Sequence, residues 1–350
     1  MSEDENRSIL HIADLVENLD MEEKILFNRI YRYYIRTGRL RLTKEMKSWA
    51  EERFGRCEEQ KIVRITNKIT LESTLFNELR AKRPIEGKET KVDIESECKF
   101  FCDPLRMTPE DSFGRISGQY CITASNIAKY DYLHGLVIFN EHTPYVDDQE
   151  KIRDYFYVAR EWFKAAYNTQ RDAKYPLILW NCMWRAGASI VHGHMQLLLS
   201  HEPYGKYELY KRICENYKKD YGRDYFLDLV SVHRALGLGI GYADSFIMSY
   251  LTPIKEKEVF IVSESLEYLP EIISKILNLY FDSKVQSFNL VVFLPPIDEK
   301  SEIPYITRIV DRGPLDVKTS DIGGMELYAG TSVVYTDPFK FAEKLKKIFT

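Results

Sequence analysis

The most informative segment of this chain of 350 residues is Asn181-Cys-Met-Trp-Arg-Ala-Gly-Ala-Ser-Ile-Val-His192-Gly-His194-Met-Gln196. Its last five residues alternate in character. Because successive side chains of a β-strand point to opposite faces, a strand here places His192, His194 and Gln196 on one face. Burying two imidazoles and a carboxamide is costly unless each polar group has a partner. The pattern therefore predicts a functional strand, and the alternative is a pair of satisfied core histidines.

The three side chains suit covalent chemistry at phosphorus. A neutral imidazole is a good nucleophile at neutral pH. Its neighbours can orient it and stabilise the oxygens of a transferring phosphoryl group.

The full spacing Asn-x5-Gly-Ala-Ser-x2-His-x-His-x-Gln resembles the active-site strand of galactose-1-phosphate uridylyltransferase and its relatives. These proteins form the transferase branch of the histidine-triad superfamily. A bare His-x-His-x-Gln arises by chance, whereas the longer version also holds Asn181, Gly187 and Ser189 in register. The resemblance extends from about residue 60 to the end of the chain.

Strand and helix patterns repeat once along the chain, which predicts an α+β fold of two related halves. Each half shows an apolar strand, an amphipathic helix and a second apolar strand. The first set is Gly135–Phe139, Asp148 to about Tyr167 and Pro176–Trp180, and the second is Glu258–Val262, Leu266–Phe281 and Phe288–Leu294. The resemblance implies two tandem histidine-triad-like halves, each a mainly antiparallel sheet with packed helices.

The expected boundaries divide the chain into three parts. Residues 1–56 carry apolar side chains at roughly helical spacing, which predicts an N-terminal helical extension. Residues 57–205 are expected to form the catalytic half, and residues 206–350 a second half without catalytic histidines. Leu290, Val291 and Val292 are expected at the place in the second half that corresponds to the active-site strand.

Composition limits the class of protein and its partners. With 45% apolar and 29% charged residues, the chain is typical of a soluble globular protein. A net charge of −4 provides no global basic field, so we expect no nucleic-acid partner. No apolar run approaches the roughly 20 residues that span a bilayer, and the N-terminus lacks a signal-peptide pattern. The six cysteines are scattered, which favours a reduced, cytoplasmic protein without membrane association.

The resemblance implies further substrate contacts. Arg80 and Arg83, in an Arg-x-x-Arg-Pro segment, are expected near the nucleotide phosphates, which guanidinium groups bind bidentately. Asn126 is expected to bond the nucleoside. Glu326, in a segment similar to a Gly-x-Glu-Met-Leu-Ala strand, is expected to bond hydroxyls of a hexose. The alternatives are a solvated basic turn for the arginines and an exposed strand carboxylate for Glu326.

A structural metal site also follows from the resemblance. Its candidate ligands are Cys98, Cys102, His142 and His192, a Cys2His2 set suited to zinc. The cysteines have three residues between them, whereas the family usually has two. Two interpretations therefore stay open, a zinc site and a pair of small buried cysteines.

The implied mechanism is a nucleotidyl transfer in two steps. His194 attacks the α-phosphorus of a nucleotide sugar, and a phosphate acceptor then removes the nucleotidyl group. Gln196 donates to an oxygen of the transferring phosphorus, and His192 either ligates zinc or orients His194. The remaining expected contacts are Ser189, Gly187 and Ala188 at the leaving phosphate and Asn181 in support of the loop.

Three functions stay open. The leading hypothesis is transfer between a nucleotide sugar and a hexose 1-phosphate, as in galactose metabolism. The first alternative is a phosphorylase of dinucleoside polyphosphates or nucleotide sugars, and the second is a nucleotide-binding protein without catalysis. Gln196 cannot protonate a leaving group, which favours a phosphate as leaving group over an alkoxide or amine. The resemblance implies a homodimer, while the nucleobase and the sugar stay undetermined.

Overall fold

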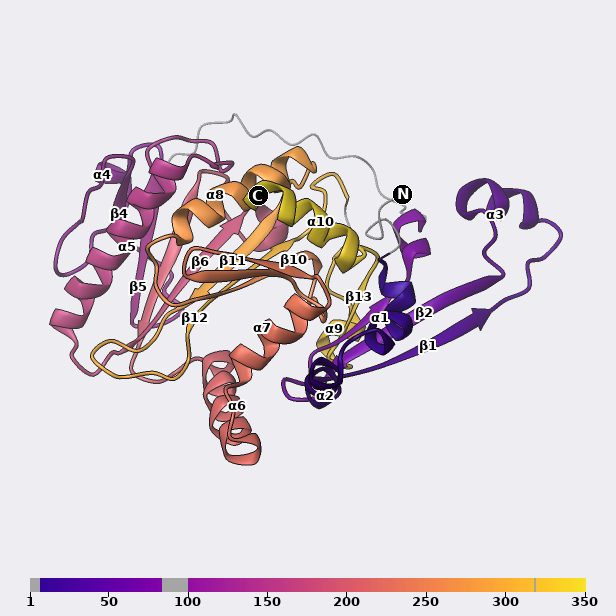
Figure 1. Cartoon of the computed structure of the whole chain (residues 1–350). Coiled ribbons are helices and arrows are strands. Elements are labelled where there is room, and N and C mark those ends of the chain that lie inside the picture. Colours follow the sequence, from indigo (N-terminus) through magenta and orange to yellow (C-terminus); the bar gives the residue numbers. More distant parts are fainter. Residues whose placement is uncertain (1–6, 84–99, 318) are drawn as a thin grey trace.

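The computed structural model describes residues 7–83, 100–317 and 319–350. Within them, one large sheet dominates the molecule (Figure 1). Its strands are β4 (Cys121–Ser125), β5 (Leu133–Phe139), β6 (Tyr175–Cys182), β7 (His194–Ser200), β8 (Gly239–Tyr242), β9 (Ser245–Ser249), β10 (Glu256–Ser263), β11 (Phe288–Phe293) and β12 (Tyr305–Asp311). Their order across the sheet is β4-β5-β7-β6-β11-β12-β10-β9-β8, and every neighbouring pair is antiparallel.

The large sheet consists of two halves with the same topology. The first half runs β4, β5, helix α5 (Gln149–Thr169), β6 and β7, and the second runs β9, β10, helix α8 (Leu269–Asp282), β11 and β12. The halves meet where β6 pairs with β11, with Trp180 opposite Leu290. The predicted α+β fold of two related, mainly antiparallel halves is confirmed, and the two sheets are continuous.

This topology shows that the counterpart of β7 is β12. In each half the strand after the helix lies at the seam, and the next strand lies one position further out. Across the sheet, Gln196 pairs with Leu179, Leu179 with Val291, and Val291 with Arg308. The expectation that Leu290–Val292 corresponds to the active-site strand is therefore wrong, because that segment belongs to the seam strand. Arg308 occupies the row of Gln196.

Helices cover the two faces of the large sheet unequally. Helix α5 begins at Asp148, whose side chain accepts from the Lys151 N–H, and packs beside α8 with buried Tyr155 and Trp162 in a continuous core. Helix α10 (Pro338–Phe349) extends this layer. The opposite face is covered at one end by α6 (Gly205–Tyr221) and α7 (Tyr225–Ala235), whose core includes Leu198. The candidate site residues His194 and Gln196 lie on this face near the start of β7.

The N-terminal extension is helical only in part. Helices α1 (Ile12–Glu17), α2 (Met21–Ile30) and α3 (Lys47–Phe54) form as expected. Between them, β1 (Tyr31–Arg39) is a strand, since alternating aromatic and β-branched side chains favour a sheet surface there. It pairs with β2 (Glu59–Asn67), which continues to β3 (Ser73–Phe76) and the parallel strand β13 (Thr331–Val334). This small sheet projects from the body (Figure 1).

A buried ionic network joins the small sheet to the large one. Arg308 donates to Glu258 at 2.5 Å and to Glu72, in the β2–β3 turn, at 2.6 Å. Lys206 on α6 reaches Glu72 at 2.8 Å. Burial opposes ionisation of Glu72, but Arg308 and Lys206 outweigh it and lower its pKa to about 2. Burial raises the pKa of Glu258. The network ties together β10, β12, α6 and the β2–β3 turn through charges that lose their partners if one member is removed.

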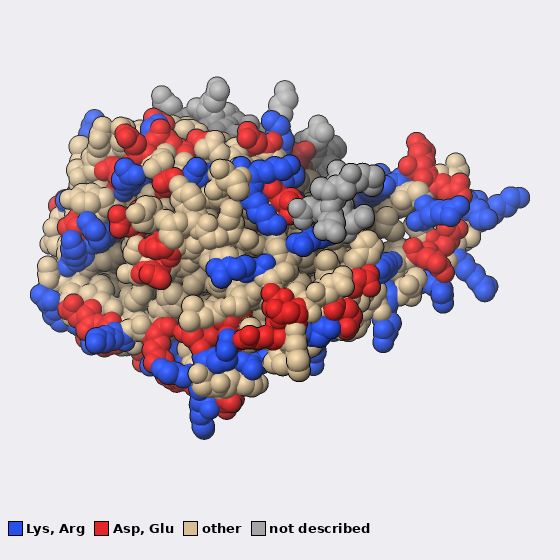
Figure 2. All heavy atoms as spheres, viewed as in Figure 1, with Lys and Arg blue, Asp and Glu red and all other residues tan. Residues whose placement is uncertain are grey.

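The charges on the surface and the state of the cysteines can both be described from the structure. On the face shown in Figure 2, acidic and basic side chains are interspersed. The described cysteines are all free thiols. Among the described helices, we find none that combines the length and the apolar character needed to cross a bilayer.

Candidate active site

His194 is the first residue of β7 and is only 7% exposed. Its Nδ1 lies 2.8 Å from the carbonyl oxygen of His192, so Nδ1 carries the proton and donates it. Burial lowers the pKa of His194, which keeps the imidazole neutral. The lone pair is consequently on Nε2. A neutral imidazole with a fixed tautomer is suited to act as a nucleophile through Nε2.

Gly193 allows the tight turn into β7. A Cβ there would lie 2.4 Å from the Phe139 ring and 2.7 Å from the Thr143 carbonyl oxygen, so only glycine fits. The strand begins at His194, and His192 lies in the preceding bend rather than on the strand. His194 and Gln196 face Ile138 and Leu136 of β5 and share one face, as the alternation predicts.

His192 faces a cluster of metal-ligand types. Its Nε2 donates to the Phe139 carbonyl at 2.7 Å, which leaves the Nδ1 lone pair for a ligand. The Cys102 sulfur lies 3.4 Å from this Nδ1 and 3.3 Å from Nδ1 of His142. Sulfur and nitrogen ligands on one tetrahedral zinc lie about 3.5 Å apart, given Zn–S and Zn–N bonds of about 2.3 and 2.0 Å. The three side chains therefore fit a zinc ion, and Cys98 lies outside the described residues.

Gln196, 5% exposed, contacts a histidine that sequence reasoning missed. Its Oε1 lies 3.2 Å from Nε2 of His134, which is on β5. Nδ2 of Asn126 lies 3.2 Å from the same nitrogen, so the predicted nucleoside contact stands beside Gln196. His134 carried no signal, because a lone histidine in an apolar strand is as easily explained by burial. Only the pairing of β5 with β7 reveals it.

The loop between β6 and β7 is held by the second half of the molecule. Asn289 on β11 donates to Oδ1 of Asn181 at 2.6 Å and to the Ala186 carbonyl at 2.8 Å. Gly187 has a φ of +92°, which favours glycine. Ser189 and Gly187 are exposed, whereas Ala188 is buried. Asn181 thus lies next to the loop and contacts it through Asn289, and its expected role in supporting the loop stays a prediction.

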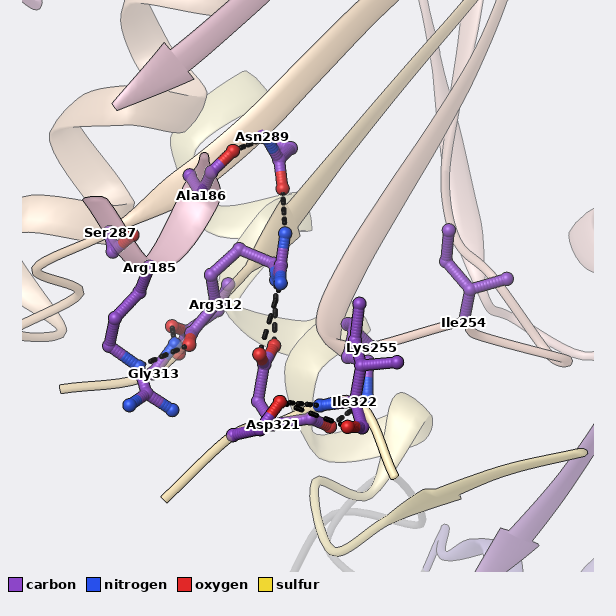
Figure 3. A network of polar contacts seen from close by, with 12 residues as sticks. Arg185, Ala186, Ile254, Lys255, Ser287, Asn289, Arg312, Gly313, Asp321 and Ile322 are labelled. Carbon is purple, nitrogen blue, oxygen red and sulfur yellow. Dashed lines mark hydrogen bonds and ion pairs between the residues drawn. The ribbon is translucent and has the colours of Figure 1, made fainter. Parts of the chain in front are cut away.

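A chain of polar contacts continues from this loop into the second half (Figure 3). Nη1 of Arg312 donates to Asn289, while Nε and Nη2 bind Asp321 at 2.6 and 3.0 Å. Arg185, from the signature segment, donates to the Arg312 carbonyl at 3.1 Å and to the Val317 carbonyl at 2.7 Å. Sequence reasoning missed these residues, because their roles depend on contacts across the seam.

Glu326 lies at the far end of this chain of contacts. It sits in the short helix α9 (Gly324–Leu327), not in the expected strand, because its carboxylate accepts from the Gly323 N–H at 2.9 Å and closes a helical turn. Lys255 donates to it at 3.1 Å. The side chain is 17% exposed, so the alternative of an exposed strand carboxylate is also wrong.

Two adjoining cavities lie over this region. One, of about 540 Å³, includes Asn289, Arg312 and Glu326 among its lining residues, over an apolar floor. The other, of about 430 Å³, is lined by Arg80, Arg83, Arg185, Arg312 and Glu326. Arg80, in the 3-10 turn η3 (Glu78–Lys82), and Arg83 are exposed at its edge. The predicted phosphate and sugar residues are thus close to one another, in a cavity with Arg185 of the signature segment.

Comparisons with known proteins show a similarity in fold and none in sequence family. The sequence matches no family model, and it matches no curated protein. The ADP-glucose phosphorylase of Arabidopsis thaliana, solved with bound ADP-glucose, has a TM-score of 0.63 at 14% identity, covering 81% of this chain and 97% of its own. A galT-like protein from Arabidopsis thaliana gives 0.60 at 14% identity over the same shares. A uridylyltransferase gives 0.55 at 14% identity, covering 82% of this chain and 98% of its own.

These structures match almost their whole length. At such low identity the likeness lies in the arrangement of the backbone, and the same arrangement follows here from the repeated halves and the seam between β6 and β11. The chain has the fold of the galactose-1-phosphate uridylyltransferase-like proteins, which the signature segment predicts.

Proposed function

We propose that this protein transfers a nucleotidyl group from a nucleotide sugar to a phosphate-bearing acceptor through a covalent nucleotidyl-His194 intermediate. The observation that carries the proposal is the tautomer of His194. Its Nδ1–H is bound by the His192 carbonyl at 2.8 Å, so the reactive lone pair is on Nε2, on the same face as Gln196. A structural histidine without chemistry would not require both features together.

In the first step, Nε2 of His194 attacks the α-phosphorus. A nitrogen–phosphorus bond forms, the phosphorus–oxygen bond to the leaving phosphate breaks, and that oxygen keeps the electron pair. The imidazole of the adduct is cationic, and the His192 carbonyl already accepts its Nδ1–H. Gln196 donates to a non-bridging oxygen. In the second step, an oxygen of the acceptor phosphate attacks the same phosphorus and releases His194.

The cluster of Cys102, His142 and His192 would hold a structural zinc ion. A bound zinc ion supplies rigidity there rather than chemistry on the substrate. His192 presents to His194 the carbonyl that fixes its tautomer, so immobilising His192 also immobilises the nucleophile.

The sugar and phosphate side of the substrate is assigned to the cavities over the second half. Arg312 and Lys255 are cationic, and Glu326 offers a carboxylate to hydroxyl groups. Arg80 and Arg83 supply further phosphate-binding groups at the edge. This mixture of cations and carboxylates favours a phosphorylated sugar, whose phosphate and hydroxyl groups need both kinds of partner. Our specific proposal is exchange between a nucleotide sugar and a hexose 1-phosphate.

A second candidate uses the same nucleophile with inorganic phosphate as acceptor. It is favoured by the likeness to a structure that is itself an ADP-glucose phosphorylase. Both reactions share the adduct, and they differ only in what discharges it. The third candidate, nucleotide binding without catalysis, predicts no adduct at all.

The test is intact-protein mass spectrometry after brief incubation with UDP-glucose, ADP-glucose, GDP-mannose or diadenosine tetraphosphate. We expect a mass gain of one nucleoside monophosphate, which also identifies the base. His194→Ala should abolish the gain. The matched control is His201→Ala, because His201 is exposed just beyond β7 and should leave the gain intact.

The acceptor is then identified by discharging the adduct. Glucose 1-phosphate or galactose 1-phosphate should remove the added mass if the protein is a transferase, and inorganic phosphate should remove it if the protein is a phosphorylase. No adduct from any donor, with the protein shown to be folded, would refute covalent transfer and leave the binding role.

A further inference from the structure

His134 is a buried histidine beside the proposed nucleophile strand. It lies on β5, is 0% exposed, and has partners on both ring nitrogens. The mechanism above does not use it, yet its imidazole contacts the carboxamide of Gln196 directly. The contact decides which end of that carboxamide faces the substrate.

The tautomer of His134 follows from a donor whose role is not in doubt. The backbone N–H of Tyr130 lies 3.0 Å from Nδ1, and a backbone N–H can only donate. Nδ1 must therefore carry the lone pair. In the neutral imidazole the proton is then on Nε2, so Nε2 is a donor.

The orientation of Gln196 follows in turn. Nε2–H of His134 points to a carboxamide atom 3.2 Å away, and only the oxygen of the carboxamide can accept it. With Oε1 held by His134, the NH2 group is left to face the other way. The Asn126 carboxamide is oriented separately, because its Oδ1 accepts from the Ala128 N–H at 3.0 Å. Its Nδ2 lies 3.2 Å from Nε2 of His134 and is also a donor, so this contact is not a hydrogen bond once Nε2 carries the proton.

The surroundings keep His134 in this state. Burial lowers its pKa to about 4, so the ring is neutral near pH 7. The charged groups that act on it are Lys129, which donates to its backbone carbonyl at 3.0 Å, and the carboxylates Asp111 and Asp131. The Tyr130 ring lies on the imidazole with a centroid distance of 4.6 Å. No rotation of the ring preserves both bonds, because the two nitrogens differ in role.

We propose that His134 is a positioning residue that orients Gln196, so that the amide N–H groups of Gln196, and not its carbonyl oxygen, face the transferring phosphoryl group. The proposal rests on the proposed nucleotidyl transfer. A reversed carboxamide would place a carbonyl dipole against phosphate oxygens, which repel it. The chain of donors runs from the Tyr130 backbone through His134 and Gln196 to the substrate.

The test compares two replacements by the single-turnover rate of adduct formation. His134→Leu removes the donor at similar size, and we expect the rate to fall about 10- to 100-fold, as expected for a misplaced catalytic group. Donor affinity, measured separately, should change less than about threefold. His134→Gln restores an N–H donor on a side chain of similar reach and should recover most of the lost rate. An equal loss in both variants would overturn the proposal.

A double-mutant cycle separates positioning from a general structural role. If His134 acts through Gln196, then His134→Leu should slow the reaction no further once Gln196→Leu is present. Independent slowing in that background would overturn the proposal. If the wild-type protein forms no adduct with any donor, the proposed function itself has failed; a normal wild-type adduct with an additive cycle refutes this role alone.

A spectroscopic measurement decides the point even if the variants do not fold. Nitrogen-15 NMR of histidine-labelled wild-type protein reports which ring nitrogen carries the proton. We expect His134 to show a protonated Nε2 and a bare Nδ1 at pH 7. The opposite tautomer would make Gln196 present its carbonyl to the substrate and would overturn the proposal.

Discussion

The two halves of the large sheet share their topology but use one equivalent position in opposite ways. In the first half, β7 places Gln196 in a setting of neutral groups, next to His134 and two residues from His194. In the second half, β12 places Arg308 in the same row, where it binds Glu258 and Glu72. One half keeps the polar groups beside the proposed nucleophile uncharged, while the other neutralises its charges internally. On the proposed function, equivalent positions therefore serve chemistry in one half and stability in the other.

The largest expected effect is on the rate of adduct formation, through Gln196 in the first half. Gln196→Leu removes the proposed phosphoryl-oxygen donor, and the rate of adduct formation should fall about 100- to 1000-fold, as for loss of an oxyanion donor. Rapid mixing followed by mass spectrometry measures it. A variant with an unchanged rate would show that Gln196 does not touch the transferring group.

The matching change in the second half should affect stability. Arg308→Leu leaves Glu72 and Glu258 buried without their cation, so the free energy of unfolding should fall by about 3–5 kcal/mol. Urea titration followed by circular dichroism measures the loss. Replacing the three most buried members, as Arg308→Leu with Glu72→Leu and Glu258→Leu, should recover a large part of it. If the triple variant were no more stable than the single one, an unpaired charge would not be the cause.

Metal removal tests whether a zinc ion at Cys102, His142 and His192 stabilises the segment that leads into β7. When the free zinc concentration is about 100 to 1,000 times the dissociation constant, binding stabilises the fold by about 3–4 kcal/mol. Cys102→Ser or treatment with a chelator should remove the metal and lower the melting temperature, and added zinc should restore it in the wild-type protein only. Elemental analysis of protein purified without added metal gives the stoichiometry. Purified, fully folded protein without metal would refute the zinc site.

A smaller effect is expected where the second half supports the loop of the first. Asn289→Leu removes the bonds to Asn181 and Ala186, and a lost buried partner costs about 1–3 kcal/mol. We expect adduct formation to slow by roughly 5- to 150-fold with zinc content unchanged, since about 1.4 kcal/mol corresponds to a factor of ten. Val291→Ala, two residues further along β11, is the control for a general effect on that strand, because its apolar side chain lines the same cavity as Asn289.

A further effect is a pH dependence of stability. The folded pKa of Glu72, about 2, lies below its ordinary value of 4.5. Such a carboxyl stabilises the fold above pH 4.5, and this contribution is lost as the pH falls from 4.5 toward 2. The difference in unfolding free energy between wild type and Glu72→Gln should therefore shrink over that range. If the difference did not change with pH, protonation of Glu72 would not contribute to the loss of stability in acid.

Periodicity predicted the parts of the molecule that depend on one element at a time. The alternation around His194 placed Gln196 on its face, and the helical pattern after Asp148 predicted α5. Strand-forming residues in Tyr31–Arg39 were obscured by helical spacing on both sides, because the pairing with β2 decides the outcome there. Propensity yields to such tertiary pairing in short segments.

The sequence could not predict contacts between strands that are distant in the chain, because such contacts depend on the order of the strands in the sheet. The relation of Arg308 to Gln196 requires the strand order, and the orientation of Gln196 requires His134 on the adjacent strand. The turn of helix at Glu326 depends on its own carboxylate closing on Gly323. The candidate site residues of the signature segment are neighbours in sequence, whereas the residues that hold them, such as His134 and Asn289, lie on other strands far along the chain.

The seam between β6 and β11 makes the two halves dependent on each other as separate polypeptides. Cutting the chain in the helical stretch between them would leave each fragment with an open edge of unpaired N–H and C=O groups along an apolar strand. Each exposed edge is the complement of the other. Coexpressed fragments should therefore reassemble into one continuous sheet, and fragments made alone should aggregate through the same edge. The seam thus provides a route to a split form of the protein whose activity reports on reassembly.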